Sequence, residues 1–261
     1  MMLKLNYCWR LLATGWCFFH LFFGGMLLAL FVVPLLSVWP GSREKKHSRA
    51  RRMVYWCFRE FVWQMRFLGV LSLDKGDVSG LLNANGHIVL ANHPTLIDVV
   101  LLMSIIPESN CIVKSALWNS PFLGGVVRST GYISNSNEAE LLLDDCDQAL
   151  KRKETLIIFP EGTRTDDPKR LKLQRGAAHV VLHTQSIVRP VLIHCEPPTL
   201  KKGEPWYKIP AVKPHFILRV QPLMDVSEHI ENELMPSQAS RRATDYLRSY
   251  FQNALNDNFK K

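Results

Sequence analysis

The sequence lacks any Cys-x-x-Cys pair, and its six cysteines lie far apart. This spacing supports neither a structural zinc site nor a redox motif. The chain also contains no internal repeats and no low-complexity tracts. Acidic residues are fewer than basic ones, with 23 Asp and Glu against 32 Lys and Arg. Hydrophobic residues make up 47% of the 261 residues, so the chain can bury a sizeable core, and its length favours one main domain.

The longest apolar run lies near the N-terminus, over residues 11–38. A helix of this length can cross about 30 Å of hydrocarbon. A cleaved signal peptide is the alternative, but its apolar core is usually about 7–15 residues long. The segment from Ser37 to Gly41 also offers Pro and Trp where a signal peptide has a small-x-small cleavage site. We therefore predict a retained membrane-anchoring helix, which either spans the bilayer or enters one leaflet and returns.

A basic cluster follows this run directly and consists of Arg43, Lys45, Lys46, Arg49, Arg51 and Arg52. Only Lys4 and Arg10 precede the run, so the charge bias predicts that the C-terminal side lies in the cytoplasm. The net charge of +9 suits nucleic acid, anionic lipid or an acidic partner. Because the basic cluster abuts the apolar run, we expect membrane lipids as partners and no nucleic acid.

Residues 53–71 predict an amphipathic helix, with polar side chains on one arc and apolar ones opposite. Such a helix can lie in a membrane interface or face a protein core, and the pattern leaves both open. We therefore predict an N-terminal membrane anchor over residues 1–75, comprising the apolar helix, a basic linker over residues 41–52 and the amphipathic helix. A second domain is predicted over residues 76–261.

Beyond residue 76, short apolar runs alternate with longer amphipathic ones, which is typical of an α/β fold. Helices are predicted over residues 95–106, 138–151 and 238–254, and a long loop over residues 196–214. The predicted strands cover residues 88–91, 111–113, 132–134, 156–159, 188–194 and 216–220.

The most informative stretch is Asn92-His93-Pro94-Thr95-Leu96-Ile97-Asp98, which follows a predicted strand. Pro94 suits a helix start, so His93 would precede the helix and Asp98 would lie more than one turn inside it. A bend at Pro94 could bring the two together, and a carboxylate on one ring nitrogen would orient the imidazole as a base. No Ser or Cys stands beside this pair, so we expect a substrate hydroxyl as nucleophile. The alternative is that His93 caps the helix while Asp98 faces solvent.

Asn92-His93-x4-Asp98, followed later by Phe159-Pro160-Glu161-Gly162-Thr163-Arg164, resembles the lysophospholipid acyltransferase family. This family includes the 1-acylglycerol-3-phosphate enzymes. Two further blocks resemble the family's second and fourth blocks, namely residues 114–124 and 188–191. The likeness covers residues 88–194 in motif order, and four ordered blocks are far more specific than one His-x4-Asp pair.

The resemblance implies a central mixed sheet flanked by helices, with His93 as general base and Asp98 as its orienting partner. It also implies an acceptor site in which Arg164 binds a phosphate by a bidentate fork. Arg175 begins a helix whose amides could add to this site, although a solvated basic face is the alternative. The residues expected to bind substrate are Asn92, Lys114, Glu161, Gly162, Thr163, Arg164 and Arg175. The Glu161-to-Arg164 turn ends an apolar strand, where open α/β sheets usually bind ligands.

The resemblance further implies transfer of a fatty acyl group from acyl-CoA or acyl carrier protein to a lysophospholipid hydroxyl, with 1-acylglycerol-3-phosphate as the expected acceptor. No metal or cofactor is expected, and the pair His179 and His183 has no evident further zinc ligands. Backbone amides near Gly162 or Gly124 are candidates for stabilising the tetrahedral oxyanion.

The chain departs from the family at Asn137, where the second block usually carries an Arg. Asn has no charge, so a phosphate there would lose a contact worth about 1.5–3 kcal/mol. Arg128 could compensate if a strand points it inward. Two alternatives follow: the same chemistry on a lipid other than lysophosphatidate, or a catalytically silent membrane scaffold.

Overall fold

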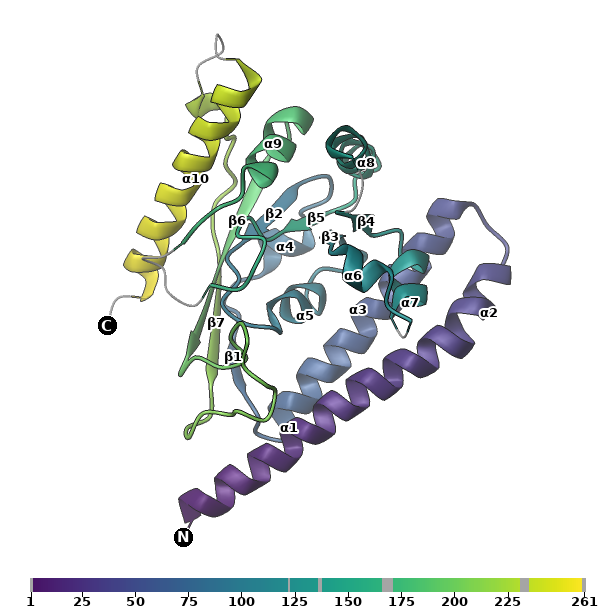
Figure 1. Ribbon diagram of the computed structural model, residues 1–261, viewed down its shortest axis with the longest axis vertical. Helices are drawn as coiled ribbons and strands as arrows, with labels where there is room; N and C mark the ends of the chain where they lie inside the picture. The colour runs from purple at the N-terminus through teal and green to yellow at the C-terminus, as the bar shows by residue number, and fades with distance from the viewer. Residues whose placement is uncertain (1, 122, 136–137, 166–170, 231–234, 260–261) are drawn as a thin grey trace.

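The computed structural model of the chain describes residues 2–121, 123–135, 138–165, 171–230 and 235–259. Within these residues, a seven-stranded sheet lies between two layers of helices (Figure 1). The strand order is β1-β7-β6-β2-β5-β3-β4, in which β6 and β7 pair antiparallel and the other neighbours pair parallel. The strands are β1 (Ser72–Asp74), β2 (Ile88–Ala91), β3 (Asn110–Val113), β4 (Ile133–Ser134), β5 (Leu156–Ile158), β6 (Val188–Glu196) and β7 (His215–Val220).

One face of the sheet is covered by helices from the first half of the chain. These are α1 (Met2–Leu27), the π-helical turn η1 (Leu28–Val32), α2 (Val33–Val38), α3 (Arg43–Phe67), α4 (Ser79–Leu82), α5 (Asp98–Met103), α6 (Ser115–Trp118) and α7 (Gly124–Ser129). The opposite face is covered by α8 (Ala139–Lys151), α9 (Arg175–Thr184) and α10 (Pro236–Phe259), and the 3-10 turn η3 (Ser227–His229) precedes α10.

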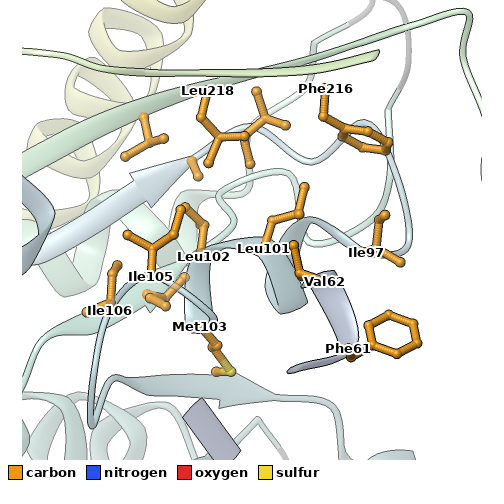
Figure 2. Close-up of a cluster of buried hydrophobic side chains, with 14 of the residues drawn as sticks. Phe61, Val62, Ile97, Leu101, Leu102, Met103, Ile105, Ile106, Phe216 and Leu218 are labelled. Carbon is orange, nitrogen blue, oxygen red and sulfur yellow. The ribbon is translucent and has the colours of Figure 1, made fainter. Parts of the chain in front are cut away.

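Each face of the sheet has its own apolar core. Figure 2 shows the first, in which Phe216 and Leu218 of β7 face Leu101 and Leu102 of α5. Phe61 of α3 joins this cluster and is 1% exposed. The second core packs α8, α9 and α10 against the other face. Burial of each such side chain contributes about 1.5–3 kcal/mol, so both faces hold the sheet in place.

The central strands are apolar along their whole length because both of their faces are covered. All four residues of β2 are buried, and β2 pairs in parallel with β5 on one side and β6 on the other. The carboxyl ends of these three strands therefore meet at one edge of the sheet. The predicted strands are present, with ends that differ by at most two residues. β1 was not predicted, since it is short and ends in Asp74.

The N-terminal helices form an antiparallel hairpin that lies along the part of the chain that forms the sheet (Figure 1). Trp9 Nε1 of α1 donates to the Leu68 carbonyl at 2.9 Å, and the rings of Phe18 and Phe61 meet edge to face at 6.4 Å. The predicted linker over residues 41–52 is instead helical from Arg43 onward and continuous with the amphipathic segment. Ser42 caps this helix, and the segment up to Phe67 contains no Gly or Pro to end it.

Candidate active site

The site begins where the Asn92 side chain fastens the end of β2 to β6. Asn92 Nδ2 donates to the Ile193 carbonyl at 2.7 Å, and Asn92 Oδ1 accepts from the Ile193 N–H at 2.7 Å. The Asn92 side-chain amide thereby makes the two hydrogen bonds that a backbone peptide group would make to β6. The β2–β6 ladder is extended by these bonds, although the backbone leaves the strand after Ala91. Asn92 was expected to bind substrate, but in the structure its side chain bonds to the sheet. The residue is only 5% exposed.

His93 and Asp98 lie in direct contact. His93 Nδ1 is 2.8 Å from Asp98 Oδ2, and Asp98 is fully buried. Thr95 adds two further hydrogen bonds to this carboxylate, from its N–H to Oδ2 and from Oγ1 to Oδ1, both at 2.6 Å. Burial raises the pKa of Asp98, and the hydrogen bonds from His93 and Thr95 oppose that rise.

The helix after this pair is shorter than the predicted 95–106 segment. It begins at Asp98, so Pro94 lies before the helix. Asp98 is the first residue of the helix, whereas the sequence predicted it more than one turn inside. The reason is local, because the Asp98 carboxylate accepts the Thr95 N–H and holds residues 95–97 in a turn. The turn after Pro94 brings His93 back over the helix start.

The backbone of His93 is held from the other side by the segment that follows β5. Glu161 Oε1 accepts from the His93 N–H at 2.7 Å, and the Thr165 N–H donates to the His93 carbonyl at 2.9 Å. Glu161 is 1% exposed, and this burial raises its pKa to about 7, against the lowering effect of the hydrogen bonds from Thr165 and His93. Both backbone polar groups of His93 are thus fixed by a segment nearly seventy residues away in the sequence.

The Glu161-to-Arg164 turn lies at the carboxyl end of β5, as predicted, but its groups are partly engaged within the protein. Gly162 adopts φ +65°, which favours glycine, and its N–H donates to the Phe159 carbonyl. The Gly124 N–H donates to Ser120, so neither of these two amides is free as the oxyanion donor. Thr163 is half-buried in the same turn.

Arg164 was expected to hold a phosphate, and the structure assigns one of its nitrogens another partner. Arg164 Nη1 donates to the carbonyls of Leu200 at 2.9 Å and Lys201 at 3.0 Å. These residues belong to the loop between β6 and β7. The remaining guanidinium N–H groups can still donate to an anion, but the two-nitrogen fork would have to be formed without Nη1.

The other cations expected at the site are placed at its periphery. Lys114 is exposed at the start of α6, and Arg175 is exposed at the start of α9. Arg128 lies on α7, not on a strand, and its Nη1 donates to the Trp118 carbonyl at 2.7 Å. Asn137 lies outside the described residues. Within the described part of the chain, no group of three His, Cys, Asp or Glu side chains could hold a metal ion.

The arrangement suits proton transfer by His93. Because Nδ1 is bonded to Asp98, Nε2 is the ring nitrogen left to accept a proton. The His93 side chain is 16% exposed, and its ring lies 4.4 Å from that of Phe159. Thr95 and Thr165 were not predicted as site residues from the sequence. Thr95 had a detectable signal, since a Thr three residues before an Asp can exchange hydrogen bonds with it at a helix start.

Comparisons with known proteins identify the family and the fold that this chain resembles. Residues 77–194 match the family model described as Acyltransferase. A 1-acyl-sn-glycerol-3-phosphate acyltransferase of Helicobacter pylori is 28% identical over 158 residues, which is 58% of this chain and 62% of that protein. A protein of the same name from Saccharomyces cerevisiae is 30% identical over 115 residues, 41% of this chain and 38% of the relative. The aligned part of the chain thus covers less than two thirds of each of these relatives.

Among solved structures, the 1-acyl-sn-glycerophosphate acyltransferase PlsC from Thermotoga maritima is similar, with a TM-score of 0.70 over 98% of this chain and 100% of that chain. The identity is 21%, so this likeness shows the fold. It confirms the predicted α/β class with a mixed sheet. The family match also covers the stretch in which the four sequence blocks lie, which confirms the resemblance. Residues 77–194 are therefore similar to the acyltransferase family over the stretch that holds His93, Asp98 and Glu161.

Proposed function

We propose that this protein transfers a fatty acyl group from a thioester donor to a lysophospholipid hydroxyl, most specifically that of 1-acylglycerol-3-phosphate. The observation that carries the proposal is the contact of 2.8 Å between His93 Nδ1 and the buried Asp98 carboxylate, inside a domain similar to the acyltransferase family. The names of the relatives support the choice of lysophosphatidate as acceptor and phospholipid biosynthesis as the setting.

In the proposed mechanism, His93 Nε2 removes the proton of the acceptor hydroxyl as its oxygen attacks the thioester carbonyl. Asp98 fixes the ring tautomer and stabilises the imidazolium that forms. Collapse of the tetrahedral intermediate breaks the carbon–sulfur bond, and His93 returns the proton to the leaving thiolate. The reaction yields an ester and a free thiol without a covalent enzyme intermediate. General acid–base catalysis of this kind contributes about 10²–10⁴ in rate.

A second candidate is the same transfer to a lipid without a phosphate at this position. Two observations favour it: Asn137 replaces an expected Arg, and Arg164 Nη1 is engaged with the carbonyls of Leu200 and Lys201. Acyl-CoA and acyl carrier protein both remain candidate donors, since basic groups at the periphery suit either. Comparison of acceptors and donors in one assay separates these possibilities.

The proposed setting is the surface of the inner or cytoplasmic membrane, with the catalytic domain facing the cytoplasm. One apolar segment, Lys4–Leu35, is long enough to span a bilayer, and 6% of its most apolar window is buried. However, α3 runs back along α1, and the catalytic half contacts this pair near both of its ends, at Arg10 and at Gly25. If α1 crossed the bilayer, the parts of the chain that contact it at these two places would be drawn into the hydrocarbon. This supports a hairpin that lies in one leaflet, and we propose it as the membrane anchor predicted over residues 1–75.

The test is release of free thiol from acyl-CoA and from acyl carrier protein by the full chain, with lysophosphatidate and other hydroxylated lipids as acceptors. The His93→Ala variant is the negative control. A matched control is His179→Ala, because His179 is exposed on α9 on the other face of the sheet.

Thiol release that needs an acceptor and His93, but not His179, supports acyl transfer, and the acceptor panel identifies the substrate. Turnover with a neutral lysolipid but not with lysophosphatidate would favour the second candidate. Lipid binding without turnover for any pair of donor and acceptor would contradict the proposal and favour a silent scaffold.

A further inference from the structure

The loop between β6 and β7, residues 197–214, begins at the rim of the catalytic site. The Leu200 carbonyl accepts hydrogen bonds from Arg164 Nη1 at 2.9 Å and from the Leu96 N–H at 3.2 Å. Leu200 is 4% exposed and adopts φ +51°, a conformation that non-glycine residues rarely take. These contacts hold the start of the loop in a conformation that would otherwise be unfavourable.

The far part of the same loop is bound to the apolar helix α1. Arg10 Nη2 donates to the carbonyls of Pro210 at 3.0 Å and Ala211 at 2.6 Å, and Arg10 is 2% exposed. The Trp206 ring lies 6.2 Å from the Phe18 ring. A Cβ at Gly15 would lie only 3.2 Å from Trp206, so the glycine makes room for the indole. The loop therefore joins the site to the helix that is proposed to bind the membrane.

The tip of the loop exposes apolar side chains beside those of α1. Trp206 is 43%, Tyr207 58% and Val212 67% exposed, and on α1 Leu12 is 72% and Trp16 54% exposed. Lys202 and Lys213 flank the tip and are also exposed. Trp and Tyr prefer the headgroup level of a bilayer, and Lys near the surface gains about 1 kcal/mol from anionic lipid. The exposed apolar surface of the loop tip is continuous with that of α1, so contact with lipid is more favourable for it than contact with water.

We propose that the tip of this loop, residues 204–212, enters the interface of an anionic bilayer beside α1 and forms a second membrane contact that is built into the catalytic half. The inference rests on the proposed membrane association of α1. Since Arg164 is bonded to the same loop, membrane contact and the arrangement of the acceptor site are physically connected.

Photocrosslinking tests the contact directly. Benzoylphenylalanine is placed at Tyr207, at Phe19 or at Leu141 in the full chain, which is bound to vesicles of phosphatidylcholine and phosphatidylglycerol. Phe19 is 57% exposed on α1 and reports the anchor, whereas Leu141 is 55% exposed on α8 across the sheet. Lipid adducts at positions 207 and 19 but not 141 are expected.

The other outcomes overturn the inference in different ways. Adducts at 19 without adducts at 207 would leave the anchor intact and remove the loop contact. Adducts at neither position would contradict both the loop contact and the membrane association of α1. A crosslink from 207 to another copy of the chain, without lipid, would make this surface a self-contact.

A second arm uses Val212→Glu, with Leu141→Glu as the matched control. Val212 is well exposed, so the charge should not disturb the fold, and melting by circular dichroism checks this. We expect vesicle partitioning to fall by at least about tenfold for Val212→Glu alone. Partitioning is measured without any substrate, so the result holds even if acyl transfer is not found. Equal partitioning of both variants would overturn the inference.

Discussion

Two clusters of buried charge lie at opposite ends of the sheet, and their compositions differ. At the amino ends of β3 and β5, Arg51 of α3 meets Glu154 at 2.9 Å, and Asn110 donates to the same carboxylate. At the carboxyl ends of the strands, two buried carboxyls hold His93: Asp98 contacts its imidazole, and Glu161 accepts from its backbone N–H. Buried charge alone therefore does not distinguish the proposed catalytic site from a structural ion pair. In the cluster around His93, burial raises the pKa of both Asp98 and Glu161, which is common at functional sites.

The largest effect is expected at the acid-rich end. Asp98→Asn keeps the shape of the side chain but removes the charge that orients His93 and stabilises its imidazolium. We expect the rate of acyl transfer to fall by about 10²–10⁴-fold, with the melting temperature in detergent little changed. Thiol-release kinetics measure the effect, and a variant with near wild-type kcat would contradict the assignment of the dyad.

The opposite end should respond in stability and not in catalysis. Glu154→Gln removes the carboxylate that pairs with the Arg51 guanidinium. The Arg51 side chain is only 4% exposed, so water cannot replace that partner. Such a loss costs about 3–5 kcal/mol. Denaturant unfolding should show this loss while kcat per folded molecule stays the same. The double variant Arg51→Met with Glu154→Leu should recover much of the stability, because the pair is then replaced by apolar groups.

The pH dependence of stability should report the raised pKa of Glu161. The folded-state pKa of Glu161 is about 7 against 4.5 for the free side chain, so the folded protein binds this proton more tightly. Its contribution to stability is full below pH 4.5 and is lost as the pH rises to 7 and above.

Glu161→Gln should remove that loss, which is of the order of 3 kcal/mol, while still accepting the His93 N–H. Unfolding midpoints of both proteins across this range measure the difference. Parallel pH profiles for the two proteins would show that folding does not raise the pKa of Glu161.

The smallest of the effects is expected at Thr95. Thr95→Val removes the Oγ1 hydrogen bond to Asp98 Oδ1, which at about 1.5–3 kcal/mol corresponds to roughly a 10- to 100-fold loss in kcat. Thr95→Ser keeps the hydroxyl and should restore most of the rate. If Val and Ser behave alike in steady-state kinetics, the hydroxyl has no role in holding the carboxylate.

Features that depend on residues close together in the sequence were predicted well. The alternating apolar runs indicated the α/β class, and the spacing around Pro94 indicated that His93 and Asp98 could meet, as they do at 2.8 Å. The basic segment over residues 41–52 was assigned to a linker because of its charge, although its lack of Gly and Pro favours the helix that the structure contains.

Long-range partners could not be predicted. Nothing in the pattern indicates that Glu161 accepts the N–H of His93, that Asn92 bonds to Ile193, or that Arg164 turns toward Leu200. Hydrophobic periodicity tells which face of an element is buried, but not which polar groups meet across elements. The motif residues were therefore found, while several of their roles within the protein were visible only from the structure.

The two hydrogen bonds between Asn92 and Ile193 have a consequence for local motion. Residues next to a catalytic loop often open and close without disturbing the rest of a protein. Here the residue before His93 is bonded to the middle of β6, a strand buried between two cores. Local opening around His93 would have to pull apart the centre of the sheet. The Ile193 amide should therefore exchange its hydrogen with solvent only at the rate of global unfolding, and the imidazole should keep its place for as long as the protein stays folded.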